Sequence, residues 1–220
     1  FKYIKEAEGD IAIFSAQPTS VRWIGNERGI AGDPVWHKVK RANITDDVKN
    51  EYLNHGDPDG DMYSVGEADV SIRSGWFYHD NQQPKSLKEL MDIYFKSVGR
   101  GTPLLLNIPP NKEGKFADAD VARLKEFKAT LDQMYATDFA KGATVTASST
   151  RQNHLYKESH LTDGTDDTSW ALSNDATTGS FTVDLGQKRR FDVVELKEDI
   201  AKGQRISGFK IEVEINGRWV

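Results

Sequence analysis

The sequence contains no cysteine, which excludes disulfide bonds, thiolate metal sites and a cysteine nucleophile. No apolar run reaches the length that a membrane-spanning helix needs, so we expect no membrane span. Basic tracts with interleaved aromatic residues are also missing, and 29 basic against 34 acidic residues give a net charge of −5. This balance argues against nucleic acid as a partner and favours a neutral or polar ligand.

The composition allows at least one well-packed core. With 220 residues, of which 37% are hydrophobic, the length of the chain favours two pieces. Five Trp and seven Tyr supply flat faces that suit stacking on sugar rings, although most buried aromatic residues simply form core. The first residues, 1–8, predict the tail of an amphipathic helix with no initial Met, which favours a processed or excised piece.

The stretch 20–32, SVRWIGNERGIAG, is the first candidate site. It follows a short apolar run and places Arg22, Trp23 and Glu27 on a glycine-punctuated loop. Cleavage of a glycosidic bond needs a carboxylic acid that still holds its proton near neutral pH. Packing against Trp23 would favour the protonated acid, whereas Arg22 would favour the carboxylate if it faced the same oxygens. We predict Glu27 as the proton-transfer group and Glu67 as its rival, with a solvated surface carboxylate as the alternative.

Strand and helix patterns alternate along the first part of the chain. The patterns predict buried strands over 10–16, 68–77 and 102–108, and helices over 86–98 and 118–135. Ser86 and Glu89 form a capping box at the start of the first of these helices. This order is typical of the closing part of a parallel β/α unit, with too few strands to close an eight-stranded barrel.

The segment 33–67 between the first two strands is long, polar and irregular. Segments of this length are usually functional rims or covers. Within it, residues 55–62 (HGDPDGDM) space three Asp two apart, as at the start of a calcium loop. The bidentate Glu of such a loop is absent, so we predict a polar turn.

From residue 142 the sequence changes to Thr, Ser and short alternating strands. These strands are predicted over 143–148, 180–185, 191–196 and 209–215. Asn216-Gly217 predicts a hairpin turn whose return strand is only three residues long. This pattern indicates a partial antiparallel β-sandwich.

The motifs of the first part resemble family 29 glycoside hydrolases, the alpha-L-fucosidases. The resemblance rests on VRWIGNERGIAG at 21–32, ADVSIRSGWFYH at 68–79 and SVGRGTPLLLNIPPNKEG at 97–114, and it is strongest to the alpha-1,3/1,4-linkage branch. It implies the α/β fold class, with residues 1–139 as the C-terminal portion of a (β/α)8-like catalytic barrel. It also implies retaining chemistry, in which an Asp attacks the anomeric carbon and Glu27 protonates the leaving oxygen.

The resemblance implies further site residues as well. The nucleophilic Asp of the family lies upstream of this chain, and neither Asp10 nor Asp33 has the matching context. Arg22 matches a position that contacts the sugar, and its alternative is a helix cap or surface salt bridge. Trp76 matches a position that lines the fucose pocket, and its alternative is barrel-end packing. Further expectations are that Trp23 and Trp36 stack on the aglycone side and that His79 is a structural imidazole.

Residues 140–220 resemble the start of a discoidin-like, or family 32, carbohydrate-binding module. The signature DG…T-x-W falls on Asp163, Gly164, Thr168 and Trp170. Such modules often hold a structural calcium, which would make Asp163 and Thr168 its ligands, although Thr165 stands where a second acid is usual. The expected fold is a jelly-roll-like sandwich.

The resemblance implies a bacterial, secreted or periplasmic, exo-acting fucosidase that needs no cofactor for catalysis. Its partner would be a fucosylated oligosaccharide or glycoconjugate, and this 220-residue piece alone would be inactive because it lacks the nucleophile. Two other functions remain open at this point. One is a non-catalytic glycan-binding protein that uses the aromatic pocket and the sandwich, and the other is a structural adhesion protein.

Overall fold

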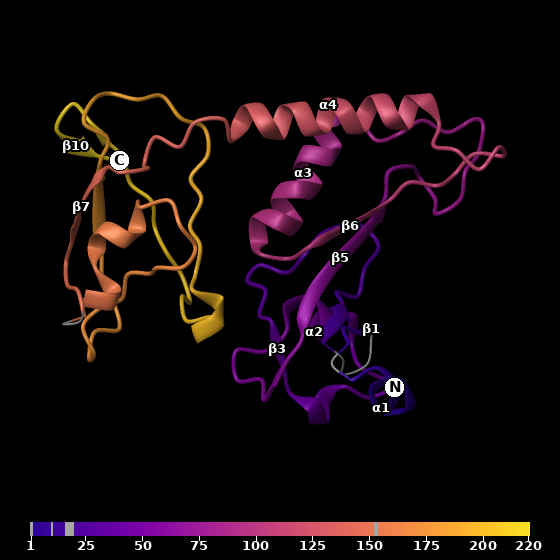
Figure 1. Cartoon of the computed structure of the whole chain (residues 1–220), viewed down its shortest axis with the longest axis horizontal. Coiled ribbons are helices and arrows are strands. Elements are labelled where there is room, and N and C mark those ends of the chain that lie inside the picture. The colour runs from indigo at the N-terminus through magenta and orange to yellow at the C-terminus, as the bar shows by residue number, and fades with distance from the viewer. Residues whose placement is uncertain (1, 10, 16–19, 152–153) are drawn as a thin grey trace. The chain divides into compact units, whose positions relative to one another are not determined.

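The chain divides into two compact units, Phe1–Gln133 (unit 1) and Met134–Val220 (unit 2). The computed structural model describes residues 2–9, 11–15, 20–151 and 154–220 (Figure 1). The division falls at the end of helix α4 (Asp118–Met134). This boundary reflects compactness alone, and the domains predicted from the family resemblance, 1–139 and 140–220, stay a prediction.

Unit 1 is built on a parallel sheet of four strands in the order β1-β2-β5-β6. The strands are β1 (Phe14–Ser15), β2 (Val21–Trp23), β5 (Val65–Ser71) and β6 (Leu104–Asn107). The α/β class and the parallel pairing are therefore as predicted. The sheet is open in the described residues, and the barrel stays a prediction.

Two strand predictions and one loop prediction for unit 1 need correction. The strand expected over 10–16 is reduced to β1, where Phe14 is exposed, and residues 10 and 16 lie outside the described residues. The stretch 20–32 begins with strand β2 rather than with a loop. The strand expected over 68–77 begins at Val65 and ends at Ser71, where its register partner Asn107 is the last residue of β6. The Ile72 N–H still donates to the Asn107 carbonyl at 2.9 Å, and residues 73–77 run past the end of β6 and its ladder.

Helices cover one side of β5 and β6 in Figure 1. Helix α3 (Leu87–Ser97) begins with the predicted capping box, in which Ser86 Oγ accepts from Glu89 N and Glu89 Oε2 accepts from Ser86 N. Ile72, Leu90 and Phe127 join the end of β5, α3 and α4 in one buried cluster. A second cluster joins Ile24, Ala31 and Ala68. Helix α1 (Lys2–Glu8) agrees with the predicted N-terminal helix.

The segment 33–67 carries more regular structure than its polar sequence indicates. It contains β3 (Lys38–Val39), the 3-10 helix η1 (Arg41–Asn43), α2 (Asn50–His55) and β4 (Met62–Tyr63), which pairs antiparallel with β3. The acidic run at 55–62 forms a polar turn, in which Asp57 Oδ1 accepts from Asp59 N and Asp61 Oδ1 accepts from Arg41 N. Over the described residues, no cluster of three acidic or His side chains is arranged for a metal ion.

Unit 2 contains two separate antiparallel pairs. Strand β7 (Thr144–Ala147) pairs with β8 (Phe181–Asp184), and β9 (Glu214–Ile215) with β10 (Arg218–Trp219). Asn216 and Gly217 form the predicted hairpin turn, with the φ values of 52° and 80° that such a turn needs.

Two strands predicted for unit 2 differ in the structure. The strand over 191–196 is not formed, and that over 209–215 is reduced to β9. The 3-10 helices η3 (His154–Tyr156) and η4 (Glu158–Leu161) lie between β7 and β8, and η5 (Ile200–Lys202) lies between β8 and β9. In unit 1, the 3-10 helix η2 (Val98–Arg100) follows α3. The complete sandwich stays a prediction.

Candidate active site

Glu27 and Trp76 meet beyond the carboxyl ends of two neighbouring parallel strands. Glu27 follows β2, Trp76 follows β5, and the Trp76 indole Nε1 donates to Glu27 Oε2 at 2.7 Å. Asn107, the last residue of β6, donates from Nδ2 to the carbonyl oxygen of Trp76 at 3.0 Å and to Ser71 Oγ at 3.0 Å. Ligand sites in parallel α/β sheets are built at this end of the strands. Glu27 is exposed, so its carboxyl group can meet a ligand.

Two glycines allow the tight path of the loop that carries Glu27. Gly25 has φ +77°, and a Cβ there would lie 2.5 Å from the Asn50 carbonyl oxygen. Gly29 has φ +70°, and a Cβ there would lie 2.8 Å from Ile93 Cγ2. Only glycine fits such positions without strain. The loop therefore packs directly on α2 and α3, which limits the positions open to Glu27.

Asparagine side chains fix the same loop from within and from α2. Asn26 Oδ1 accepts from Arg28 N, and its Nδ2 donates to the Ile30 carbonyl at 2.9 Å. Asn54 Nδ2 donates to the carbonyls of Ile24 and Ile30, at 3.2 and 3.0 Å. These contacts satisfy carbonyl groups that the turn leaves without ladder partners.

The site face of β5 carries two more carboxyl groups. Glu67 and Asp69 are half-buried on one side of the strand, because side chains two apart share a face. Burial and the neighbouring Asp69 raise the pKa of Glu67. Burial also raises the pKa of Asp69, against the lowering effect of its hydrogen bond from Trp23, and the charge of Glu27 raises it further. The rival acid Glu67 thus lies on the same sheet face as Asp69.

Asp69 and Asn107 were missed by sequence reasoning. The predicted strand ran from 68 to 77, which placed Asp69 at the start of the strand, whereas it lies near the end of β5 (Val65–Ser71). The period-two alternation of Glu67 and Asp69 was the available signal. Asn107 sits in an apolar run, and only the register Ser71↔Asn107 shows that it ends β6 beside the Trp76 loop.

Trp23 donates a hydrogen bond to Asp69. It lies on β2, opposite Glu67 in register, and its indole Nε1 donates to Asp69 Oδ1 at 2.9 Å. The indole that donates a hydrogen bond to Glu27 is that of Trp76. Trp23 remains half-buried on the site side of the sheet.

Arg22 lies on the opposite side of β2 and is 1% exposed. Its guanidinium donates from Nε to the Leu53 carbonyl at 2.9 Å, from Nη2 to the Trp36 carbonyl at 2.7 Å and from Nη1 to the Ser64 carbonyl. Burial lowers the pKa of Arg22 to about 10, with Tyr52 acting in the opposite direction, so the group stays charged at neutral pH. This placement is neither the sugar contact nor the surface salt bridge considered from the sequence, because the side chain binds three main-chain carbonyls.

Trp36 and His37 belong to the same buried region as Arg22. The Trp36 main chain donates to the His55 carbonyl at 2.7 Å and accepts from Arg22, and its side chain is half-buried. His37 Nε2 donates to the Gly101 carbonyl at 2.9 Å, and its Nδ1 accepts from Gly66 N at 3.1 Å. Burial lowers the pKa of His37, and these two bonds fit its neutral form. The stacking role expected for Trp36 stays a prediction.

The loop that carries Trp76 is anchored by a buried ion pair. Arg73 Nε donates to both Asp120 oxygens, at 3.1 and 2.9 Å, with the side chains 3% and 0% exposed. The Arg73 guanidinium also lies 4.7 Å from the ring centroid of Tyr78. Lys85 Nζ donates to the carbonyls of Ser71 and Arg73. The loop is thus tied to α4 and to the end of β5, which fixes the region from which Trp76 reaches Glu27.

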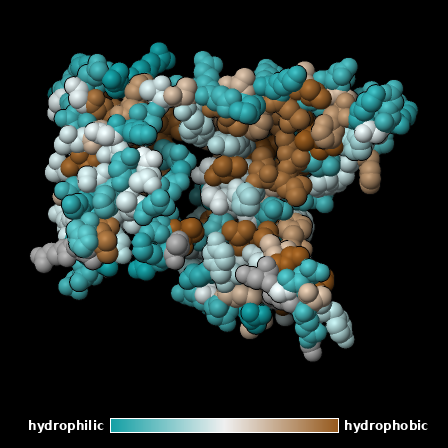
Figure 2. Space-filling view, in the orientation of Figure 1, coloured by the Kyte–Doolittle hydropathy of each residue, from teal (hydrophilic) through white to brown (hydrophobic). Residues whose placement is uncertain are grey.

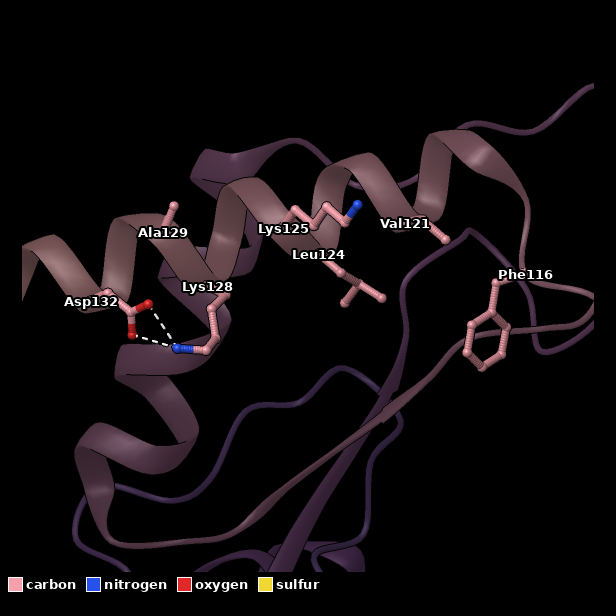
Figure 3. Close-up of a pocket in the computed structure, with 7 residues that line it drawn as sticks. All are labelled: Phe116, Val121, Leu124, Lys125, Lys128, Ala129 and Asp132. Carbon is pink, nitrogen blue, oxygen red and sulfur yellow. Dashed lines mark hydrogen bonds and ion pairs between the residues drawn. The ribbon is translucent and has the colours of Figure 1, made fainter.

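An apolar groove of about 420 Å³ runs along α4, away from these residues (Figure 3). Phe116, Val121 and Leu124 form its apolar wall, and Lys128 and Asp132 form an ion pair at 2.7 Å at its rim. Figure 2 shows hydrophobic side chains gathered beneath α4. No residue of the candidate site lines this groove.

Asp163 and Thr168 form a closed turn in unit 2. Thr168 Oγ1 donates to Asp163 Oδ2 at 2.6 Å, and Thr165 N donates to Asp163 Oδ1 at 3.1 Å. The Thr168 hydrogen bond is the main cause that lowers the pKa of Asp163. Both oxygens of Asp163 thus accept hydrogen bonds from within the turn. The calcium site stays a prediction.

Two family models match consecutive parts of the chain. The Alpha-L-fucosidase model matches residues 29–134, and the F5/8 type C domain model matches residues 144–220. Unit 1 therefore belongs to the alpha-L-fucosidases, family 29 of the glycoside hydrolases, and an F5/8 type C, or discoidin-like, segment follows it.

Individual relatives cover the whole chain. The crystal structure of SpGH29 is 50% identical in sequence to this chain and superposes with a TM-score of 0.94. The aligned region includes 100% of this chain and 48% of the SpGH29 chain. The Ruminococcus gnavus GH29 fucosidase E1_10125, solved in complex with fucose, is 38% identical with a TM-score of 0.87. Its aligned region includes 100% of this chain and 47% of the fucosidase chain. Alpha-L-fucosidase 1 of Arabidopsis thaliana is 34% identical over 220 residues, which are 99% of this chain and 44% of the relative. The chain thus spans less than half the length of these proteins.

Proposed function

We propose that the parent of this chain is a retaining exo-alpha-L-fucosidase and that Glu27 is its general acid/base. The observation that carries the proposal is the 2.7 Å hydrogen bond from Trp76 to Glu27 beyond the carboxyl ends of β2 and β5. Glycoside cleavage needs a carboxyl group that can reach the leaving oxygen, and active sites on parallel β/α sheets lie at this end of the strands. The names of the relatives support fucose as the sugar that is released.

The proposed reaction has two steps. In the first, the carboxylate nucleophile that the family places upstream attacks the anomeric carbon, the glycosidic C–O bond breaks, and the proton of Glu27 passes to the leaving oxygen. In the second, water attacks the same carbon, Glu27 takes its proton, and the bond to the nucleophile breaks. Trp76 donates to Oε2, which leaves Oε1 for the proton and stabilises the carboxylate after transfer.

The aromatic residues take different parts in this proposal. Trp76 lines the fucose pocket while it holds Glu27, and Trp23 and Trp36 serve the aglycone side. Arg22 has no place in the sugar contacts, because its guanidinium is buried on the main chain of 33–67. Residues 140–220 begin a carbohydrate-binding module that would bring the parent, a secreted or periplasmic protein, to fucosylated glycans.

The test is Glu27→Gln in the full-length parent, with an aryl alpha-L-fucoside as substrate. We expect hydrolysis to fall by about 10²–10⁴-fold, because proton transfer contributes on that order. Added azide restores turnover as fucosyl azide, since it attacks the covalent intermediate without needing a base. The control is Glu51→Gln, which removes a carboxylate of α2 that is 85% exposed. Unchanged turnover of Glu27→Gln would remove Glu27 from the mechanism.

A second test concerns the chain alone. We expect no hydrolysis of the aryl fucoside by the purified 220-residue chain, because the family nucleophile lies outside it. Activity of the purified chain would show that its own carboxyl groups suffice. An Asp at a strand end in the upstream sequence of the parent supports the enzyme, and Asn or Gly there supports a glycan-binding protein.

A further inference from the structure

Asp69 contacts both ends of the segment that carries Glu27. Its side-chain Oδ1 accepts from the Trp23 indole N–H at 2.9 Å, and its carbonyl oxygen accepts from Gly29 N at 2.9 Å. The next residue, Val70, forms an isolated antiparallel bridge with Arg28. One residue of β5 thus fixes the chain before and after Glu27.

The two contacts of Asp69 differ in what a mutation can change. The carbonyl contact to Gly29 belongs to the main chain and survives any side-chain replacement. The contact to Trp23 needs an acceptor oxygen on the side chain and a donor on the ring. Trp23 is half-buried, and the acceptor of its indole N–H is Asp69 Oδ1. A variant without the Asp69 oxygens leaves that N–H unsatisfied and the ring free to turn.

The charges around Asp69 are negative. Glu67 lies two residues before it on the same face of β5, and the charge of Glu27 acts on it from the loop after β2. The positive end of the Trp23 indole N–H dipole is what faces its Oδ1.

We propose that Asp69 is a positioning residue for the proposed acid/base: through the Trp23 indole it fixes the start of the loop that presents Glu27. The proposal rests on the proposed function and adds a residue that does not itself touch the sugar. Trp76 then holds the carboxyl group of Glu27, while Asp69 holds Trp23 and Gly29, which precede and follow Glu27 in the chain. Misplacement of a catalytic group by about 1 Å costs on the order of a hundredfold in rate.

Three variants of the full-length parent separate the hydrogen bond from the charge. Asp69→Ala removes acceptor and charge, Asp69→Asn keeps an acceptor oxygen without charge, and Trp23→Phe keeps a ring without the donor. We expect kcat to fall about tenfold to a hundredfold in Asp69→Ala and Trp23→Phe, with KM for the aryl fucoside within about threefold. Asp69→Asn should retain kcat within about threefold, because its amide oxygen accepts the same N–H. Asp92→Ala, an exposed carboxylate of α3, is the control.

A double variant and a spectroscopic readout complete the test. Trp23→Phe with Asp69→Ala should be no slower than Asp69→Ala alone, since both remove one interaction. In the ¹⁵N-labelled chain, which has five Trp, the Trp23 indole N–H should exchange slowly with solvent in the wild type and Asp69→Asn and quickly in Asp69→Ala. This readout does not depend on activity, so it tests the Asp69 contact even if the parent proves not to be a fucosidase.

Two results would overturn the positioning role. One is an Asp69→Asn variant as slow as Asp69→Ala, which would assign the effect to charge. The other is an unchanged kcat in Asp69→Ala. If Glu27→Gln is inactive and rescued by azide while Asp69→Ala is normal, the inference fails and the proposed function stands.

Discussion

Replacement of Arg22 by Met should destabilise unit 1 rather than weaken sugar binding. The substitution removes donors from the carbonyls of Leu53, Ser64 and Trp36, and Leu53 and Ser64 are each 1% exposed. A buried acceptor left without a partner costs about 1–3 kcal/mol, so the loss sums to about 4 kcal/mol. At roughly 3 °C per kcal/mol for a unit of this size, we expect the unfolding midpoint to fall by roughly 10–15 °C.

The assay for Arg22→Met is thermal unfolding followed by far-ultraviolet circular dichroism. The described α-helices lie in unit 1 apart from the last residue of α4, so the helical signal reports on that unit. Arg41→Met, which removes an exposed arginine of the same unit, is the matched control and should shift the midpoint by less than about 2 °C. An unchanged midpoint for Arg22→Met, together with a raised KM in the parent, would refute the structural role and restore the sugar contact.

Three further predictions follow from the same structure. Trp76→Phe in the parent should lower kcat about tenfold with a smaller change in KM, because it removes the N–H that holds Glu27. A change in KM as large as the change in kcat would contradict this. Asp120→Ala should cost about 3–5 kcal/mol in urea unfolding, because it leaves buried Arg73 unpaired, and a cost below about 1 kcal/mol would refute the pair. Folding lowers the pKa of His37, so the neutral imidazole contributes to the free energy of unfolding. This contribution is complete above about pH 6.5, where His37 is neutral in the folded and the unfolded state, and it is lost as the pH falls below that value. His37→Gln should therefore reduce the drop in unfolding temperature between pH 7 and 5, and an equal drop in both proteins would exclude His37 as a cause.

Local signals predicted the helices of unit 1 better than its strands. Helix α3 could be predicted because its start depends on Ser86 and Glu89, which are three residues apart, and its buried face on helical spacing. The end of β5 depends on where β6 ends, at Asn107, and that pairing is not written in the sequence around Ser71. In unit 2, the alternating residues 191–196 form no strand, since alternation without a paired neighbour does not produce a ladder.

The candidate site was predictable in part for the same reason. Glu27 and Trp76 stand in short motifs, so the sequence pointed to both, but which indole reaches the carboxyl group depends on loops from different strands. The direction of Arg22 was missed because its partners lie 14, 31 and 42 residues away. Asp69 was missed because the strand was drawn six residues too long at its end, from Ser71 to 77.

The guanidinium of Arg22 has a practical meaning for protein engineers. It connects three separate points of the segment 33–67, at Trp36, Leu53 and Ser64, to one strand of the sheet. Exchanging this segment between homologues as a cassette would break all three connections at once unless the grafted piece restores them. Mutagenesis of this segment should therefore vary individual side chains on its outer surface and leave its backbone intact.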